Sequence, residues 1–400
     1  MKFSLFVFAA MLAWPTARAD WLNFRGPNGA GYAAETPNLP AEFSEETQAW
    51  KVALPGRGLG SAILVGDKVF VTAASGPEQK LLHVLCFHGG NGEPIWERRF
   101  RATGRTMSHK KTAVAAPTPA SDGERIYALF SSNDLICLDL EGNLRWMRGL
   151  TLDYPNASNS LGLASSPIVA GDTLVAQIEN DSESFAAGFD LHTGENKWKI
   201  ERPKAANWTS PTVLEADGEK IVALQSSKGI LGVFPSTGST VFTIGGGAST
   251  IPSSAPAGDR LFIPAHGLTV FRVSAGGGEP EKLWNESAQR PGTASPLVLG
   301  GKAYVVNNAG VLSCADTTTG ERLWRMRLTG PISASPVAGD NDRLYVFSET
   351  GVGQVVDVSG AEGKVVSEIE LEETILSTPS LDEGAVYIRS DGHLWKFGNR

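Results

Sequence analysis

Short apolar segments of four to six residues recur along the chain, and Gly, Asp, Asn or Ser separates each segment from the next. The clearest copy begins at Ser295-Pro296, passes through apolar pieces around Tyr304, and ends at Trp324. Its apolar residues are β-branched or aromatic, or alternate with polar ones, which is typical of strands. No segment has a long 3.6-residue periodicity. The pattern therefore predicts four short strands per unit and almost no helix after the first residues of the chain.

The unit repeats, and one aromatic position measures its length. In most copies a Gly lies four residues before this aromatic, as Gly320 does before Trp324. The aromatic positions are Trp50, Trp96, Trp146, Trp198, Phe242, Trp284 and Trp324, in steps of 40 to 52 residues. A repeat of this length with four strands per copy is typical of a β-propeller, so we predict one all-β domain.

The two ends of the repeat complete each other. Eight units begin, at Ala62, Pro119, Pro167, Pro211, Ser254, Pro296, Pro336 and Pro379. The unit from Pro379 has only three strands before the chain ends, whereas the segment around Trp50 resembles a fourth strand with none before it. Pairing residues 48–53 with the C-terminal three strands would close the ring and leave no free inner edge. We predict an eight-bladed β-propeller of four-stranded antiparallel blades over residues 48–400, after a non-repeat segment at 20–47.

Residues 1–19 have the features of a signal peptide. A short apolar run follows Lys2, and Ala17-Arg18-Ala19 is a small-x-small cleavage site, so we expect cleavage before Asp20. The run is too short to span a bilayer, and no cysteine follows the site to carry a lipid. An uncleaved anchor is the alternative. We expect a monomer that is exported to the periplasm or the exterior, with no lipid anchor and no transmembrane segment.

Charge and cysteines narrow the choice of partners and chemistry. The formal net charge is −8, and losing Lys2 and Arg18 with the leader would make it −10, which disfavours nucleic acid and anionic membranes as partners. Cys86, Cys137 and Cys314 occupy the same third-strand position of different units. Equivalent positions in different blades lie too far apart for a disulfide, so we expect three small buried hydrophobes.

The motif Asp-x-x-Thr-Gly-Glu-x-x-Trp, with Ser-Pro-x-x-x-Gly-Asp opening each unit, resembles the pyrroloquinoline-quinone-like (PQQ-like) β-propeller repeat over residues 48–397. Residues 21–29 and 109–123 look like those of an exported bacterial subgroup with this repeat. The superfamily holds quinoprotein alcohol dehydrogenases and a non-enzymatic outer-membrane barrel-assembly factor. The resemblance implies that Trp50 and its six equivalents dock one blade against the next, which is a structural role.

The resemblance also implies what an enzyme of this superfamily needs. The dehydrogenases hold a planar quinone over a Trp, with Ca²⁺ ligated by Glu, Asn and Asp, and many place a vicinal Cys-Cys on the quinone. This chain has no Cys-Cys, no Cys-x-x-Cys-His for a haem, and no acidic cluster with a calcium-loop pattern. We therefore expect no cofactor, metal or catalytic residue, with PQQ and calcium as the alternative.

Candidate binding residues come from the segments that link the last strand of one blade to the first strand of the next. These links lie on one face of a propeller, around its channel, and two of them, 101–116 and 150–164, are long enough to carry function. The first is basic in an otherwise acidic chain, so we expect a positively biased mouth for an anionic ligand or an acidic segment of another envelope protein. The candidates are Arg57, Arg101, Arg105, His109, Lys110, Lys111, Tyr154, Asn156, Asn159, Asn207 and Trp208.

The sequence thus favours a non-catalytic interaction scaffold in the bacterial envelope. A quinone-dependent alcohol or sugar dehydrogenase is one alternative. A carbohydrate-binding module that stacks sugars on Trp208 or Tyr154 is the other. We expect Trp21 and Phe24 to anchor part of the segment at 20–47, because exposed aromatics so close together are uncommon.

Overall fold

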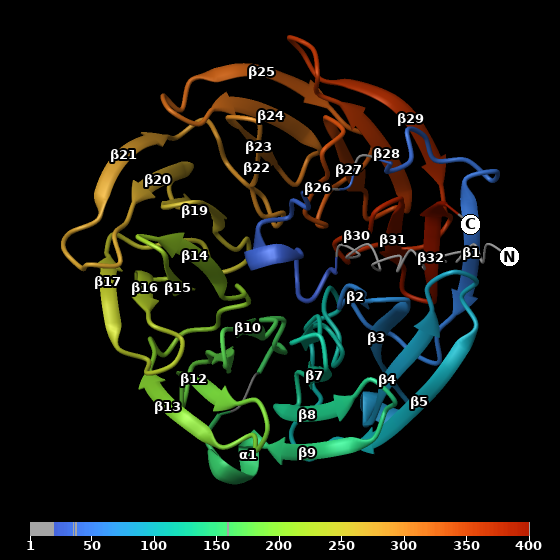
Figure 1. Cartoon of the computed structure of the whole chain (residues 1–400), viewed down its shortest axis with the longest axis vertical. Helices are drawn as coiled ribbons and strands as arrows, with labels where there is room; N and C mark the ends of the chain where they lie inside the picture. Colours follow the sequence, from blue (N-terminus) through green and yellow to red (C-terminus); the bar gives the residue numbers. More distant parts are fainter. Residues whose placement is uncertain (1–19, 35, 37, 158–159, 400) are drawn as a thin grey trace, which may run out of the picture.

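A computed structural model describes residues 20–399, except residues 35, 37, 158 and 159. Within these residues, 32 strands form eight four-stranded antiparallel sheets that stand around a common axis (Figure 1). The prediction of an eight-bladed propeller is confirmed. The predicted signal peptide lies outside the described residues.

Seven blades consist of four consecutive strands each, and the first four of them span residues 63–244. Their strands are β2 (Ile63–Val65), β3 (Lys68–Ser75), β4 (Leu81–His88) and β5 (Pro94–Arg101) in blade 1; β6 (Ala120–Ser121), β7 (Arg125–Leu129), β8 (Asp134–Asp139) and β9 (Leu144–Gly149) in blade 2; β10 (Ile168–Ala170), β11 (Thr173–Ile178), β12 (Phe185–Asp190) and β13 (Asn196–Glu201) in blade 3; and β14 (Thr212–Ala216), β15 (Glu219–Ser226), β16 (Gly229–Val233) and β17 (Thr240–Ile244) in blade 4.

The remaining four blades follow, and blade 8 takes one strand from the beginning of the chain. Their strands are β18 (Ala255–Ala257), β19 (Arg260–Pro264), β20 (Leu268–Arg272) and β21 (Glu281–Glu286) in blade 5; β22 (Leu297–Leu299), β23 (Lys302–Val306), β24 (Val311–Asp316) and β25 (Arg322–Arg327) in blade 6; β26 (Val337–Ala338), β27 (Arg343–Phe347), β28 (Val352–Asp357) and β29 (Lys364–Glu370) in blade 7; and β30 (Ser380–Leu381), β31 (Ala385–Arg389), β32 (His393–Gly398) and β1 (Gln48–Ala53) in blade 8. The described helices are short: α1 (Leu150–Asp153) and the 3₁₀ turns η1 (Pro27–Gly29) and η2 (Pro77–Gln79).

The first strand of the chain closes the ring, as predicted. β1 pairs antiparallel with β32, with Lys51 opposite Trp395 and Ala53 opposite His393. Blade 8 therefore joins the two ends of the repeat into one sheet, in which β1 lies beside β32 (Figure 1).

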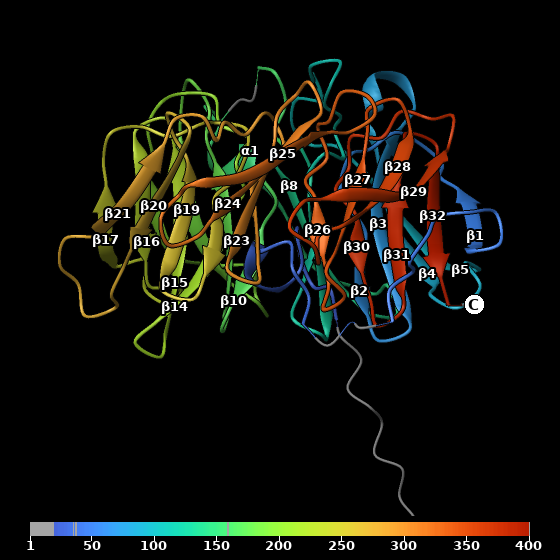
Figure 2. The same cartoon turned by 90° about the horizontal axis from the view of Figure 1, so that it is seen from above.

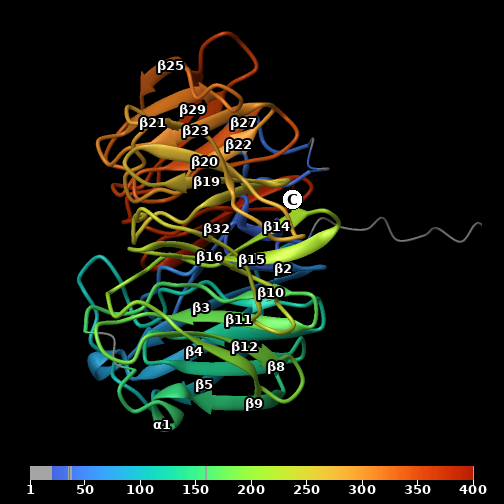
Figure 3. The same cartoon turned by 90° about the vertical axis from the view of Figure 1, so that its left-hand side faces the viewer.

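Burial explains why the strands of one blade differ in sequence. All six residues of β8, an inner strand, are buried, because neighbouring blades cover both faces of the sheet (Figures 2 and 3). The outermost strand β29 alternates exposed and half-buried positions along its whole length. Continuous apolar runs therefore mark inner strands, and alternation marks the rim of the ring.

The repeated tryptophans dock one blade onto the next, and the partner of each is the motif glycine of the following blade. A Cβ added to Gly194 in blade 3 would lie 2.6 Å from the ring of Trp146 in blade 2, and one added to Gly142 would lie 2.8 Å from Trp96. Both glycines have φ near +80°, which L side chains avoid. The Trp146 indole Nε1 also donates to Leu191 O at 3.0 Å. The motif glycine thus has two roles. Its positive φ permits the turn in its own blade, and its lack of a side chain leaves room for the indole of the preceding blade.

The three cysteines lie beneath these aromatics. Cys86 pairs with Trp96, Cys137 with Trp146 and Cys314 with Trp324, and a bulge follows each pair. All three are buried free thiols, as predicted, and burial raises the pKa of Cys86 and Cys137 to about 12. Gly188 fills the same position under Trp198, and Val270 fills it under Trp284.

Among the described residues, every helix falls short of the length and apolar character that a membrane span requires.

Candidate functional site

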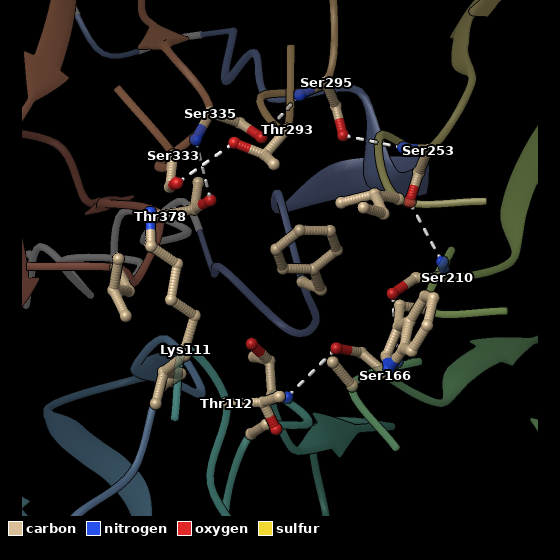
Figure 4. A pocket seen from close by; sticks show the side chains of 18 of the residues that line it. Lys111, Thr112, Ser166, Ser210, Ser253, Thr293, Ser295, Ser333, Ser335 and Thr378 are labelled. Atoms are coloured by element: carbon tan, nitrogen blue, oxygen red, sulfur yellow. Dashed lines mark hydrogen bonds between the residues drawn. The ribbon is translucent and has the colours of Figure 1, made fainter. Parts of the chain in front are cut away.

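A cavity of about 400 Å³ lies at the axis of the ring, where the inner strands of the blades begin (Figure 4). Its wall is made of Ser and Thr side chains from the start of several blades, together with apolar side chains such as Leu59, Leu376 and Trp208. Lys111 and His109 from the link between blades 1 and 2 also line it.

The Ser and Thr residues form a belt of hydrogen bonds that passes from blade to blade. Apart from Ser61, each hydroxyl accepts the main-chain N–H of the equivalent residue in the preceding blade, with N···O distances of 2.9 to 3.2 Å. Figure 4 shows several of these bonds as dashed lines. The links run in order through Ser61, Thr118, Ser166, Ser210, Ser253, Ser295, Ser335 and Thr378. The belt explains the Ser or Thr that opens each unit: its hydroxyl satisfies a buried N–H of the neighbouring blade.

The belt is interrupted between blade 8 and blade 1. Ser61 Oγ has no hydrogen-bond partner among the described residues. Different contacts cross this seam: Ser380 Oγ donates to Ala62 O at 2.6 Å, and Arg389 Nη1 donates to Gly60 O at 3.3 Å. Arg389 is fully buried, and burial lowers its pKa to about 9.

Residues 21–33, which we call the plug segment, run through the centre of the ring, where Figure 1 shows η1. Trp21 is fully buried and exchanges main-chain hydrogen bonds with Leu64 of blade 1 at 3.0 and 3.1 Å. At its other end, Ala33 donates its N–H to Ala338 O of blade 7 at 3.0 Å.

The middle of the plug segment reaches the far side of the ring. η1 lies against β14 and β18, and Arg25 Nη2 donates to Pro296 O of blade 6. Arg25 is fully buried, which lowers its pKa to about 9. The predicted anchoring by Trp21 is confirmed, and Phe24 of the same segment is half-buried and lines the inner end of the cavity.

Arg57 braces the basic link at the mouth of the cavity. Its Nη1 donates to Thr112 O at 2.7 Å and its Nη2 to Lys110 O at 2.9 Å, while Nε lies 3.2 Å from Asp391 Oδ1. Arg57 thus holds the main chain of the link, and its charge faces a carboxylate.

Lys111 crosses the mouth to blade 7. Its Nζ lies 2.8 and 2.9 Å from the two carboxylate oxygens of Glu349, and Ser333 Oγ donates to the same carboxylate at 2.6 Å. Partial burial alone would raise the pKa of Glu349, but the bonds from Lys111 and Ser333 hold this pKa below its usual value. Among the described residues, Arg101, Arg105 and Lys110 are the exposed cations of this link that form no ion pair, and exposed His109 lies beside them.

The structure brings only some of the predicted residues to the cavity. His109, Lys111 and Trp208 line it, and Arg57 and Lys110 lie in or against the same mouth. Arg101 is the exposed last residue of β5, and exposed Arg105 borders a second cavity of about 280 Å³.

The rest of the predicted set lies elsewhere. Tyr154 packs its ring 4.6 Å from that of Phe185, with Lys199 Nζ 4.4 Å from its centroid, so its face is covered. Asn156 is exposed, and its carbonyl accepts the N–H of Glu183. Asn159 lies outside the described residues. Sugar stacking on the face of Tyr154 that Lys199 covers would therefore require Lys199 to move.

Asn207 belongs to a buried cluster behind the cavity wall. Its Nδ2 donates to Glu179 Oε2 at 2.9 Å, and Arg202 Nε lies 2.6 Å from Glu179 Oε1. Burial raises the pKa of Glu179 despite the opposing charge of Arg202. Next to it, half-buried Trp208 donates its indole N–H to Gly162 O at 2.8 Å.

This cluster permits a test of whether quinone and calcium fit the chain. Glu179 and Asn207 are side chains of the kind that ligate Ca²⁺, but both oxygens of Glu179 already accept hydrogen bonds, one of them from a guanidinium. Ca²⁺ requires six to eight oxygens. Among the described residues, no three His, Cys, Asp or Glu side chains gather in a group that could hold a metal. The residues present do not fit the calcium-bound quinone.

Sequence reasoning missed two parts of the site. The Ser and Thr of the belt were visible as the start of each unit, but a repeated strand start gives no sign that its hydroxyl reaches the next blade. Phe24 lies in a segment without repeat character, and its position inside the ring depends on contacts of the plug segment with blades 1, 2, 4, 5, 6 and 7.

The fold and the cavity define a class: an eight-bladed propeller of PQQ-like repeats with its axis closed from within. A family model described as "Outer membrane protein assembly factor BamB" matches residues 41–176, 156–244, 242–325 and 308–399. Because these matches cover most of the chain, the protein belongs to that PQQ-like repeat family.

Individual relatives are distant. BamB of Burkholderia pseudomallei is 28% identical over 120 residues, which are 29% of this chain and 30% of that protein. The crystal structure of BamB from Moraxella catarrhalis matches 88% of this chain and 97% of its own, at 16% identity and a TM-score of 0.62.

Dehydrogenases share the fold as well. A europium-containing methanol dehydrogenase matches 95% of this chain and 98% of its own, at 12% identity and a TM-score of 0.73. The quinohemoprotein alcohol dehydrogenase of Comamonas testosteroni matches 95% of this chain and 80% of its own, at 12% identity and a TM-score of 0.71. At such identities the likeness shows the fold alone.

Proposed function

We propose that this protein is an exported, non-catalytic interaction scaffold of the bacterial cell envelope, which binds another envelope protein at the mouth of its axial cavity. Membership of the family described as outer membrane protein assembly factor supports the envelope and the scaffold role. The observation that carries the proposal is the closed axis: Phe24 of the plug segment occupies the inner end of the cavity, and the long non-repeat links surround its other end.

Charge supports an acidic partner. Lys111 and Arg57 are matched to Glu349 and Asp391, so the cationic character of the mouth rests on Lys110, with Arg105 on the same link at the neighbouring cavity. These side chains are exposed on a chain whose formal net charge is −8. A local field of opposite sign speeds the encounter with a partner and selects its orientation.

Site-specific photo-crosslinking in the bacterium that makes the protein tests this function. A photoreactive residue replaces exposed Lys110 at the mouth. In the matched control it replaces exposed Lys220, on the β14–β15 hairpin at the opposite end of the strands. We expect a discrete adduct with one envelope protein from position 110 and none from position 220. Adducts that are the same at both positions, or absent at both, would contradict the proposal.

The absence of a quinone cofactor is part of the proposal and has its own test. Purified protein is titrated with PQQ and Ca²⁺ while visible absorbance and dye-coupled oxidation of alcohols and sugars are followed. Because the Glu179 carboxylate is held by Arg202 and Asn207, we expect no saturable spectral change and no activity. Stoichiometric quinone binding with turnover would overturn the non-catalytic part of the proposal.

A further inference from the structure

We propose that the axial cavity is a socket for one large apolar side chain, presented by an acidic segment of the partner protein. The inference rests on the proposed function, because it names the kind of partner segment that the mouth accepts. It follows from the shape of the cavity, the chemistry of its wall and the side chains around its opening.

The cavity has one blind end. Phe24 lines its inner end, and the plug segment that carries Phe24 is hydrogen-bonded to blade 1 at Leu64 and to blade 7 at Ala338. An occupant therefore enters from the mouth and cannot pass through the ring, which suits the end of a single side chain. A volume of about 400 Å³ lies at the lower end of the range of about 300–1,000 Å³ typical of ligand pockets.

The wall favours an apolar group inside. Leu59, Leu376, Trp208 and Phe24 contribute apolar surface. The belt hydroxyls are nearly buried and already accept main-chain N–H groups, so their lone pairs are partly used by the fold. No Asp or Glu is among the described residues that line the cavity. A cationic group deep inside would lose its hydration with no carboxylate in the wall to replace it.

The rim favours a partner larger than the cavity. Leu161 and Ile251 line the opening and are 46% and 47% exposed, although side chains of this kind are usually buried. The N–H of His109 donates to Leu161 O at 2.9 Å, which joins the basic link to the apolar rim. Apolar and cationic side chains therefore lie side by side at the opening, and a peptide with an apolar residue between acidic ones is complementary to both.

Glu349 indicates where an acidic neighbour would bind. Its carboxylate already lies against Lys111 Nζ and Ser333 Oγ at the rim. A carboxylate of the partner would find the same two donors by displacing Glu349, or would bind Lys110 beside them. The apolar side chain of the partner thus lies inside the cavity, and the partner's acidic residues lie at the mouth.

Fluorescence polarisation with synthetic probes tests the socket, using the protein from residue 20 onward. The probe is a fluorescein-labelled, amidated peptide Gly-Asp-Glu-Phe-Glu-Asp-Gly, and two further peptides replace its Phe by Ala or its four acidic residues by Lys. Burial of a Phe side chain corresponds to roughly a ten- to hundredfold gain in affinity, so we expect the Ala peptide to bind at least tenfold more weakly. The Lys peptide should not bind.

Matched variants locate the binding. Leu161→Trp places a larger side chain over the mouth and should lower the affinity for the Phe peptide at least tenfold. Leu144→Trp, at a 52% exposed position on outer strand β9, should leave binding unchanged. Lys110→Glu should lower the affinity for both acidic peptides and reduce the salt dependence of binding. Lys220→Glu should change neither.

Three results would overturn the socket. They are equal affinity for the Phe and Ala peptides, no effect of Leu161→Trp, and binding of the Phe peptide no tighter than that of free phenylacetate, which would indicate a site for small carboxylates. The proposed function is judged separately by the crosslinks from position 110. A crosslinked partner together with a failed peptide series would refute the socket and leave the scaffold standing.

Discussion

The contact between each repeated aromatic and the glycine of the next blade can be measured at Gly194. This glycine has φ +72°, and a Cβ at this position would lie 2.6 Å from the Trp146 ring. Gly171, in the β10–β11 turn of the same blade, has φ +62° and nothing within 4 Å of such a Cβ. Replacement of either glycine by Ala puts the same strain on the backbone, but only Gly194→Ala also drives a methyl group into an indole.

The two costs can be estimated separately. An L residue in the left-handed region costs about 1–2 kcal/mol, which both variants share. Overpacking a tight contact adds about 1–3 kcal/mol, which falls on Gly194→Ala alone. We therefore expect Gly194→Ala to lower the free energy of unfolding by about 2–5 kcal/mol and Gly171→Ala by about 1–2 kcal/mol.

Urea unfolding of the two variants, followed by circular dichroism, measures this difference. A second comparison in a Trp146→Ala background removes the indole, so the two glycine variants should then cost the same. Equal costs of Gly194→Ala and Gly171→Ala in the wild-type background would refute the idea that the glycine is required by its neighbour's indole. A difference that persists without Trp146 would show that the extra cost arises from another contact.

Three further variants probe the belt, the buried cluster and the mouth. Ser210→Ala leaves a buried main-chain N–H of the preceding blade without its acceptor and should cost about 1–3 kcal/mol in urea unfolding. Arg202→Met leaves Glu179 buried without its cation and should cost about 3–5 kcal/mol, most of which Glu179→Gln in the same chain should restore. Lys111→Ala removes a cation that keeps the pKa of Glu349 low, so its small stability loss should be present at pH 7 and vanish as pH falls below about 4, which pH-dependent melting would show.

The fold was predictable because its determinants repeat. Eight copies of one unit give eight chances to recognise the strands, and Trp50 without preceding strands was enough to place β1 beside β32. The partner of each tryptophan was not predictable, because the Gly four residues before it in sequence contacts the tryptophan of a different blade. Sequence spacing identified both residues but did not show which of them are in contact.

The site was predictable only where it departs from the repeat by length or charge. The basic link, with His109 and Lys111, was found because it is long and cationic, and these two residues line the cavity. Tyr154 was expected on the same grounds, but its ring is covered by Phe185, a contact between residues 31 positions apart that no local pattern encodes. Phe24 was unpredictable as a cavity residue, because the plug segment has no periodicity and its course is set by contacts with blades throughout the chain.

The repeated positions of this molecule are used by the ring itself. The motif tryptophans dock the blades, their partner glycines leave room for them, and every belt hydroxyl except that of Ser61 satisfies a main-chain N–H of its neighbour. Changing one of them costs stability, so such positions have little freedom to acquire a separate binding role. The recognition that we propose therefore depends on residues that occur once, and at the cavity these are Phe24, Leu161, Ile251, Lys111 and the basic side chains beside it. Because they come from separate links held by a closed ring, their relative positions are fixed before a partner arrives, which lowers the entropic cost of binding.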